Sequence, residues 1–464
     1  MKIKLLLAAL FIGATLISCE KKTLEPASET VTNQWIHANM KYWYYWTDKM
    51  TASPDFSKDP EAFFESLLYR YDATARPDGD RFSWIRESAD ELEASLGGES
   101  KTSGMEYKLT YFPFGSSNII GVVLYVLPDS PAAKAGFKRG DIFNSVNGQK
   151  LTGANYSKLL NTQEKVTYTL ATINADGALV DGTTQREVTP VVFQEDPVFF
   201  DTLYSIGANK IGYVVYHQFI PEPFQAANTA YDKKLDAIFN TFKTANVNAL
   251  IVDLRYNPGG YVSSATNLAS LIVKATANDI FYYKEYNAEV TKTNLDKYGE
   301  AYFYDKFNSK SQNIGSQLKR VVFLVSSRSA SASELLINGL KPYMNVTLVG
   351  GKTVGKNVGS VTLSDPKKRV KWGLQPIVSK SLNRDKKSDY AVGFTPDFAV
   401  SEGNILYPYG NPKDPLLGEA LFQITGTRVT RQVRNARTLQ AEDSQEITST
   451  IQKKAGGSNM FYDK

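Results

Sequence analysis

The sequence predicts an α/β protein whose largest domain is built on a mostly parallel sheet. Residues 211–219 and 249–254 are apolar and strand-like, and a helical pattern over 224–245 separates them, which is the layout of a β-α-β unit. A further buried-strand pattern at 321–325 is followed by helical spacing over 332–340. A helical segment and a β-rich segment come before this region. We therefore expect two or three domains.

Composition agrees with this size and excludes several classes of function. The chain has 464 residues, of which 42% are hydrophobic and 22% charged, so it can bury a large core. Its net charge is 53 minus 48, or +5; without Lys2 and Lys4, which belong to a predicted leader, it is 51 minus 48, or +3. This small, dispersed charge does not indicate nucleic-acid binding. No metal-ligand cluster, phosphate loop or dinucleotide fingerprint is evident, so we expect no cofactor.

The N-terminus has the layout of a secretory leader. A basic start and an apolar stretch occupy residues 1–18, and the motif LISC ends at Cys19, the sole cysteine of the chain. This motif resembles a bacterial lipoprotein processing box, which implies cleavage before Cys19 and its acylation, with 19–31 as lipidated tether. The alternative is an incidental cysteine lost with an ordinary signal peptide. We expect an extracytoplasmic protein, lipid-anchored to a bacterial membrane in the periplasm or at the cell surface.

Residues 32–100 are predicted to form an N-terminal helical domain. An aromatic-rich helical pattern runs from Trp35 to Trp46, and a second helix opens at Asp59 and Pro60, a cap followed by a first-turn proline. The aromatic stripe is typical of core packing, although it could also wall a substrate groove.

Residues 101–195 are predicted to form a small β-rich domain. Its clearest stretch, SPAAKAGFKRGDIFNSVNG at 130–148, contains a capped short helix and an Asn-Gly turn. The string resembles a PDZ domain, which implies that an extended peptide adds to a sheet edge. The expected peptide-binding loop departs from the usual Gly-Leu-Gly-Phe type and comprises Gly104, Met105, Glu106 and Tyr107.

Ser331 lies in the turn between the predicted strand at 321–325 and the predicted helix at 332–340. A side chain on such a turn projects from the sheet edge, and the first N–H groups of the helix are unpaired and positively poised. This position suits a nucleophile, provided that a base takes the hydroxyl proton. The alternative is structural, because Ser331 and Glu334 also form a capping-box pattern.

Lys356 is the candidate base. The chain has two histidines, His37 and His217, and neither has an obvious route to Ser331, so a Ser-His-Asp triad is not expected. A lysine serves as a base only when desolvation lowers its pKa, and Lys356 is flanked by valines and a glycine. The alternative is an ordinary loop lysine in a Gly-rich turn.

The glycine pair Gly259–Gly260 follows the strand that ends at 254. A glycine pair can be a plain tight turn. It can also let a substrate carbonyl approach backbone N–H groups, in which case Gly259 or Gly260 and Ala332 form an oxyanion hole. Asp253 and Arg255 are interpreted as structural.

The strings SASASE, VGGKT, GK and DLRYNPGG resemble those of the carboxyl-terminal processing peptidases, also called tail-specific proteases. The segment DRFSWI at 80–85 is similar to a stretch that these peptidases carry before their PDZ domain. The resemblance implies a Ser/Lys dyad, with Ser331 as nucleophile and Lys356 as base. The chain has Asn357 and Ser360 where the family often has glycine and glutamine, so Ser360 and Glu334 are both candidates to orient Lys356.

The resemblance further implies a crotonase-like serine protease core at 196–427, with the PDZ domain inserted before it. The expected function is a cell-envelope serine endopeptidase that cleaves unfolded or flexible protein segments, so its partners are protein or peptide substrates. The competing hypothesis is a catalytically silent envelope lipoprotein that binds peptides or another polymer. Charged and small residues dominate the C-terminal tail at 428–464, and we expect its last residues, about twenty in number, to be loosely ordered.

Overall fold

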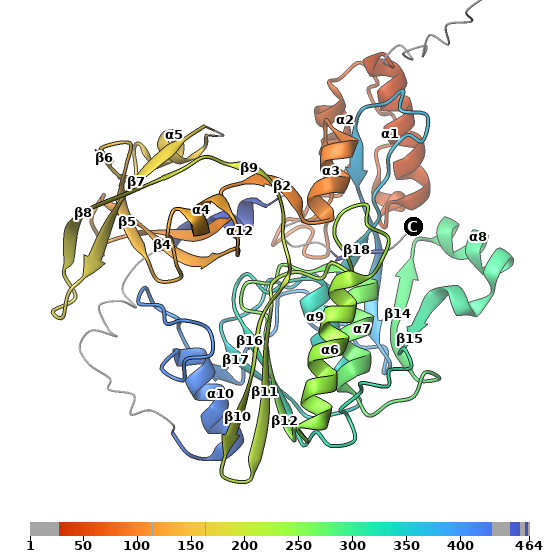
Figure 1. Ribbon diagram of the computed structural model, residues 1–464. Helices are drawn as coiled ribbons and strands as arrows, with labels where there is room; N and C mark the ends of the chain where they lie inside the picture. The colour runs from red at the N-terminus through yellow and green to blue at the C-terminus, as the bar shows by residue number, and fades with distance from the viewer. Residues whose placement is uncertain (1–26, 114, 163, 429–445, 455–459, 463–464) are drawn as a thin grey trace, which may run out of the picture.

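A computed structural model describes residues 27–113, 115–162, 164–428, 446–454 and 460–462. Figure 1 shows three parts: an N-terminal helical domain in red and orange, a β-rich domain in yellow, and a larger α/β core in green to blue. The leader, Cys19 and most of the predicted tether lie outside the described residues.

The core is organised around a mostly parallel six-stranded sheet, as predicted. Its strand order is β10-β11-β12-β16-β17-β21, and only β10 runs antiparallel to its neighbour. The strands are β10 (Val198–Ile206), β11 (Asn209–Tyr216), β12 (Ala249–Asp253), β16 (Val321–Val325), β17 (Val346–Gly350) and β21 (Phe398–Ala399). Because parallel strands end at the same edge, the loops after β12, β16 and β17 lie side by side.

Helices cover both faces of this sheet. The helices on one face are α6 (Ala230–Thr244), α7 (Val262–Ile272) and α9 (Ala332–Leu340), and α10 (Pro415–Thr425) covers the other (Figure 1). Alternate strand residues face the two layers; Val252 packs towards α6 and α7, whereas Ile251 packs towards α10. Both faces are buried, which explains why the strands read as continuous apolar runs.

Helix α6 begins at residue 230, six residues later than the pattern predicted. Pro221 and Pro223 precede it, and three residues with positive φ, Gln225, Ala227 and Thr229, turn the chain before the helix starts. Residues in this left-handed region cannot belong to a right-handed helix. The apolar spacing was correct, and the turn chemistry within it was missed.

A second, mixed sheet lies beside the first, in the order β13-β23-β18-β20-β14-β15. Its strands are β13 (Gly260–Tyr261), β14 (Ile280–Tyr286), β15 (Tyr304–Lys306), β18 (Val358–Ser360), β20 (Ile377–Asn383) and β23 (Met460–Phe461). The polar segment after α7 also contains α8 (Ala288–Tyr298) and the 3-10 turn η2 (Glu300–Phe303).

The N-terminal domain packs its aromatic stripe into a core. Its elements are α1 (Glu29–Trp43), η1 (Thr47–Lys49), α2 (Pro60–Leu67), β1 (Trp84–Arg86) and α3 (Ala89–Leu96), and β1 pairs with β19 (Gly373–Gln375). Ile36, Met40 and Tyr44 are buried against Phe63 of α2, so the stripe is core rather than groove wall. The first turn of α1, capped by the Ser28 hydroxyl, is helical although it was assigned to the tether.

The β-rich domain forms a sheet in the order β22-β3-β4-β5-β7-β8, with β6 paired to β5. Its elements are β2 (Glu99–Thr102), β3 (Met105–Tyr111), β4 (Ile119–Val126), α4 (Pro131–Lys134), β5 (Ile142–Val146), β6 (Gln149–Lys150), α5 (Tyr156–Leu160), β7 (Val166–Ile173), β8 (Leu179–Val188) and β9 (Val191–Gln194). The capped helix predicted at Ser130 is α4, whose Ala133 N–H donates to the Ser130 hydroxyl at 3.2 Å.

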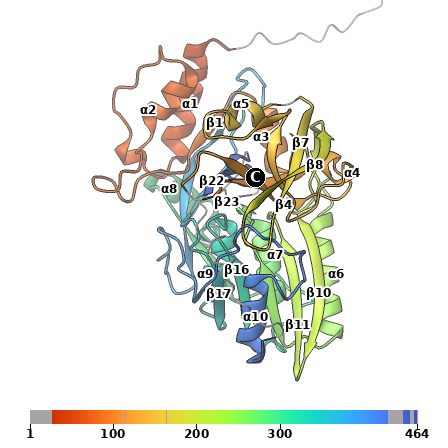
Figure 2. The same cartoon turned by 90° about the vertical axis from the view of Figure 1, so that its left-hand side faces the viewer.

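The expectation of a loosely ordered tail is wrong for the described residues after 445. They form β22 (Glu446–Ser449), α12 (Thr450–Lys453) and β23. Strand β22 belongs to the sheet of the β-rich domain, and β23 belongs to the second sheet of the core. Ile451, Met460 and Phe461 are buried. The mostly polar composition of this region hid a few apolar residues that pack against distant parts of the chain. Figure 1 shows α12 beside the β-rich domain, and Figure 2 labels β22 and β23.

Candidate active site

Ser331 sits on a strained turn between β16 and α9. Its φ of 63° and ψ of −112° place a non-glycine residue in an unfavourable backbone conformation, at a cost of about 1–3 kcal/mol. Such a turn between a strand and a helix holds a side chain out from the end of a sheet. The residue is fully buried in this state. Strain that persists at one serine indicates a positional requirement.

The neighbouring serines have structural roles that Ser331 does not share. Their hydroxyls donate to backbone carbonyls of the loop that follows β12: Ser326 to Arg255, Ser329 to Leu254 at 2.7 Å, and Ser333 to Asn257 at 3.0 Å. Among the described residues, nothing forms a hydrogen bond with the Ser331 Oγ. The serines at 326, 329 and 333 therefore hold two loops together, and Ser331 keeps its hydroxyl available for chemistry.

Glu334 joins the backbones of the two predicted dyad residues. Its Oε2 accepts the N–H of Ser331 at 2.9 Å and the N–H of Lys356 at 2.8 Å. Its Oε1 accepts the N–H of Gly355 at 2.7 Å and the Thr353 hydroxyl at 2.5 Å. Burial raises the pKa of Glu334, while these hydrogen bonds oppose the shift. The carboxylate half of the capping box predicted at α9 is thus present, and the same carboxylate also positions the backbone of Lys356.

Ser360, the other candidate to orient Lys356, is directed elsewhere. It belongs to β18, four residues beyond the lysine, and its hydroxyl donates to the carbonyl of Met460 at 3.0 Å. The structure therefore favours Glu334 as the group that fixes the lysine backbone.

Lys356 is fully buried in the loop between β17 and β18. Desolvation lowers its pKa to about 7, although Asp80 and Glu334 act in the opposite direction. The ammonium nitrogen lies 5.1 Å from the centroid of the Phe82 ring. A lysine with this pKa is neutral in a large fraction of molecules at neutral pH, which is the state required of a base.

The N-terminal domain helps to build this environment. Arg81 donates two hydrogen bonds, to the carbonyls of Gly355 at 2.6 Å and Ala391 at 2.7 Å. Asp80 is buried and accepts the Tyr44 hydroxyl at 3.0 Å. Our sequence reasoning assigned no role to these residues. The sequence signal for both residues is the segment DRFSWI, whose resemblance to the family's stretch does not by itself assign a role to either of them.

The glycine pair also lies at this edge, and its two members differ. The N–H of Gly259 donates to the Asn257 side chain at 2.9 Å, so it is already engaged. Gly260 has a φ of 138°, and an added Cβ would come within 2.1 Å of the Phe219 carbonyl. Only glycine fits there. The engaged N–H of Gly259 is thus the least suited of the predicted oxyanion donors, which also include Gly260 and Ala332, the first residue of α9.

His217 and Arg255 have structural surroundings. The His217 ring stacks on Tyr125 of the β-rich domain at 3.9 Å, and burial holds its pKa well below the ordinary value. Arg255 pairs with Asp253 at 2.9 Å and with Asp414 at 2.8 Å. Neither observation gives them a part in chemistry.

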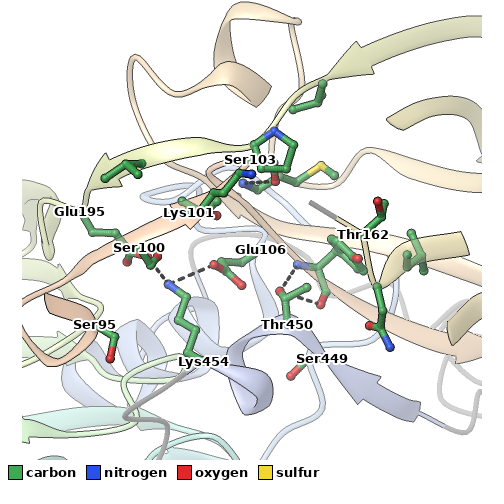
Figure 3. Close-up of a pocket in the computed structure, with 18 of the residues that line it drawn as sticks. Ser95, Ser100, Lys101, Ser103, Glu106, Thr162, Glu195, Ser449, Thr450 and Lys454 are labelled. Atoms are coloured by element: carbon green, nitrogen blue, oxygen red, sulfur yellow. Dashed lines mark hydrogen bonds and ion pairs between the residues drawn. The ribbon is translucent and has the colours of Figure 1, made fainter. Parts of the chain in front are cut away.

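The predicted peptide-binding loop lines a cavity of about 930 Å³ (Figure 3). Met105, Glu106 and Tyr107 line it at the start of β3, while Gly104 turns the chain with a φ of 78° just before. Residues from the end of the chain already touch this loop. The Tyr107 N–H donates to the Thr450 hydroxyl at 3.0 Å.

In the described part of the chain, no helix is both long and apolar enough to cross a bilayer.

Three family models match the chain. The model of peptidase family S41 matches residues 210–400, that of the peptidase S41 N-terminal domain matches 32–84, and that of the PDZ domain matches 122–172. The first two models cover the dyad candidates and the Asp80–Phe82 segment.

Curated relatives and solved structures agree with these matches. A carboxy-terminal-processing protease of Bartonella bacilliformis is 24% identical over 316 residues, which are 68% of this chain and 65% of that protein. A CtpA-like serine protease of Staphylococcus aureus is 25% identical over 275 residues, or 58% and 48%. The match thus spans half to two thirds of the length of these relatives. A crystal structure of an S41 protease from Bacteroides fragilis superposes with a TM-score of 0.69 and 27% identity, covering 84% of this chain and 97% of that one. The chain therefore belongs to peptidase family S41 and carries that family's N-terminal domain together with a PDZ domain.

Proposed function

We propose that the protein is a serine endopeptidase that cleaves unfolded or flexible protein segments with a Ser331/Lys356 dyad. One observation carries the proposal: a strained, buried serine with an unengaged hydroxyl shares a carboxylate, Glu334, with a buried lysine whose pKa is about 7. Structural serines and surface lysines do not require this arrangement.

The reaction follows from the groups at the sheet edge. Neutral Lys356 accepts the proton of the Ser331 hydroxyl while the oxygen attacks the carbonyl carbon of the substrate. The N–H groups of Gly260 and Ala332 stabilise the resulting oxyanion. Collapse breaks the C–N bond, and the Lys356 ammonium returns its proton to the departing amine. Lys356 then deprotonates a water molecule, which hydrolyses the acyl-enzyme and regenerates Ser331.

The resting geometry requires one adjustment before this chemistry. The Ser331 Oγ has no hydrogen-bond partner among the described residues, so Lys356 Nζ must come within reach of it during turnover. Catalytic hydrogen bonds commonly tighten only when substrate binds.

The substrate class rests on the PDZ domain and on the names of the relatives. An extended peptide can add to the PDZ sheet at β3, the strand edge that β22 occupies in this state, and this binding mode favours flexible protein ends. The Bartonella relative is named for carboxy-terminal processing. We propose the same mode here, with PDZ-guided delivery of a protein end.

The activity is tested with purified full-length protein and unfolded casein. Ser331→Ala should reduce cleavage about a thousandfold, because the nucleophile is lost. Ser327→Ala is the matched control, since Ser327 is an exposed serine of the same loop, and it should cleave like the parent. Equal cleavage by Ser331→Ala and parent would overturn the dyad. Peptide binding without cleavage by any variant would instead favour the silent peptide-binding lipoprotein.

We also propose that Cys19 anchors the protein to a bacterial membrane from outside the cytoplasm. The support is the order of basic start, apolar stretch and LISC motif. Cells grown with labelled palmitate should incorporate label into the parent and not into Cys19→Ser. Equal labelling of both proteins would contradict the anchor.

A further inference from the structure

The end of the chain occupies the edge of the PDZ sheet where a peptide ligand would add. Strand β22 pairs antiparallel with β3 and forms the outermost strand, with Thr448 opposite Leu109 and Ser449 opposite Lys108. Peptide ligands of this domain type bind in the same manner, by extending the sheet. A second peptide cannot use this edge while β22 occupies it.

Charged and polar contacts hold this segment in place. Figure 3 shows Lys454 reaching between two carboxylates, those of Glu106 at 3.0 Å and Glu195 at 2.5 Å. Glu106 belongs to the predicted peptide-binding loop. The adjacent Thr450 hydroxyl contacts both the N–H and the carbonyl of Tyr107. Residues Thr450 and Lys454 therefore contact the same loop that is predicted to bind an incoming peptide.

The same segment is linked to the loop that carries Ser331. The Arg328 guanidinium pairs with Glu446 and donates to the Ser449 hydroxyl at 3.2 Å. Arg328 lies three residues before the candidate nucleophile. Strand β22, which occupies the PDZ edge, is thus in direct contact with the loop that carries Ser331.

Further along, the chain enters the second sheet beside the candidate oxyanion glycine. Strand β23 runs parallel to β13 on one side, with Met460 opposite Gly260, and to β18 on the other, with Phe461 opposite Ser360. The carbonyl of Met460 accepts the Ser360 hydroxyl at 3.0 Å. Strand β23 therefore fills a slot one strand wide, between the glycine loop and the strand that follows Lys356.

The slot accommodates the side chains of this strand. Met460 is buried in the peptidase core, and the Phe461 ring packs on Tyr261 with a centroid distance of 4.3 Å. The Tyr462 hydroxyl lies 2.6 Å from the Ser379 hydroxyl. At Gly359, a Cβ would come within 2.6 Å of that Tyr462 hydroxyl, so glycine leaves room for the ring.

The peptide bond of a substrate must lie in this slot in order to be cleaved. Its carbonyl has to reach Gly260 and Ala332, so the peptide has to run along β13, which β23 now covers. Ser331 and Lys356 are both fully buried in this state.

We propose that residues 446–454 and 460–462 act as a built-in inhibitor that blocks the PDZ edge with β22 and the substrate slot with β23. The inference rests on the proposed peptidase function and adds its regulation. A protein end that binds the PDZ edge displaces β22, breaks the contacts of Lys454 and Arg328, and thereby releases β23 from the slot. An attached segment has an effective concentration in the millimolar range, so dilute substrates compete poorly and resting activity is low.

The first experiment measures binding without catalysis. A fluorescent peptide with the sequence of residues 446–464 is titrated into full-length Ser331→Ala, with and without the added changes Lys454→Met and Phe461→Ala. The peptide should bind at least tenfold more tightly when the resident segment is weakened, and a scrambled peptide should not bind. Equal affinity in the two proteins, or binding to neither, would overturn the proposal.

The second experiment measures cleavage of casein by the full-length protein with intact Ser331. Lys454→Met should cleave at least fivefold faster than the parent, while Lys413→Met, the same change at an exposed lysine, should not differ. Lys454→Met retains Met460 and Phe461 in the core and so guards against misfolding of the double variant. Unchanged or slower cleavage by a folded Lys454→Met contradicts the inhibitor. If no variant cleaves casein but the difference in peptide affinity persists, the proposed peptidase function is contradicted. The proposal that the segment occupies the peptide-binding edge is then still supported.

Discussion

Lys356 and Lys454 are both enclosed by protein, and their surroundings drive their charges in opposite directions. Burial lowers the pKa of each. At Lys454, the carboxylates of Glu106 and Glu195 outweigh burial and hold the pKa well above its ordinary value. At Lys356, burial dominates and lowers the pKa to about 7. One lysine is therefore kept as a permanent cation, and the other is able to release its proton.

The difference lies in how the nearby carboxylate is used. Glu334 is close to Lys356, but its oxygens accept three backbone N–H groups and one hydroxyl. The Glu334 carboxylate therefore holds the main chain in place through these hydrogen bonds. Glu106 and Glu195 contact the Lys454 ammonium directly. Burial alone thus does not make a lysine basic or acidic; the direction of the neighbouring hydrogen bonds decides the outcome.

The sharpest test of the comparison is the same substitution at both lysines. Lys356→Met should reduce kcat/KM for casein about a thousandfold, because the base is removed. Lys356→Arg should be equally inactive, since a guanidinium does not release its proton near neutral pH. Lys454→Met should act in the other direction, as argued above. Retention of more than a tenth of the activity by Lys356→Met would remove the lysine from the mechanism.

The next largest effect is expected at Glu334. Glu334→Gln turns an NH₂ group towards N–H donors, which should lower stability by about 2 kcal/mol. The backbones of Ser331 and Lys356 lose their common anchor, and a small displacement of catalytic groups costs about a hundredfold in rate. Urea unfolding measures the first effect and casein cleavage the second. Wild-type activity in a destabilised Glu334→Gln protein would show that the carboxylate serves folding alone.

Arg81 offers a smaller effect through the backbone. Arg81→Lys keeps the charge but cannot reach both carbonyls, of Gly355 and Ala391, in the same geometry. We expect a decrease of about tenfold in kcat, with little change in KM for casein. Lys41→Met, at an exposed lysine of α1 in the same domain, is the control. A change confined to KM would place Arg81 in substrate binding instead.

The smallest effect is expected from Asp80→Asn. The Asp80 carboxylate raises the pKa of Lys356, so its loss lowers that pKa further. Activity requires neutral Lys356 and therefore rises with pH through about 7 in the parent; the variant should show this rise at lower pH. At pH 7 the gain is limited to about twofold, because half of the parent molecules already hold a neutral lysine. A rise shifted to higher pH would contradict the assigned sign.

Much of the site could be predicted because its residues are close in sequence to recognisable strand ends. The apolar strand before Ser331, the glycine pair after β12 and the lysine after β17 are each local patterns. Parallel pairing of β12, β16 and β17 then brings their ends together. The shared role of Glu334 was only half visible, because a capping box accounts for Ser331 but not for the contact with Lys356.

Other features depend on contacts between distant parts of the chain. Arg81 meets Gly355 across 274 positions, and Lys454 meets Glu195 across 259. Residues 446–454 and 460–462 include few apolar residues, so their composition indicated a loose tail. Their structure depends on surfaces contributed by the PDZ domain and by β13 and β18, which no local pattern could reveal.

The central claim is that Lys356 is stripped of water and able to be neutral at physiological pH. It is tested by titrating ¹³C-labelled lysine side chains by NMR in full-length Ser331→Ala, with the Lys356 signal assigned from its absence in Ser331→Ala with Lys356→Met. The account predicts a midpoint near 7 for this signal. A midpoint near the ordinary lysine value of about 10.4 would contradict it.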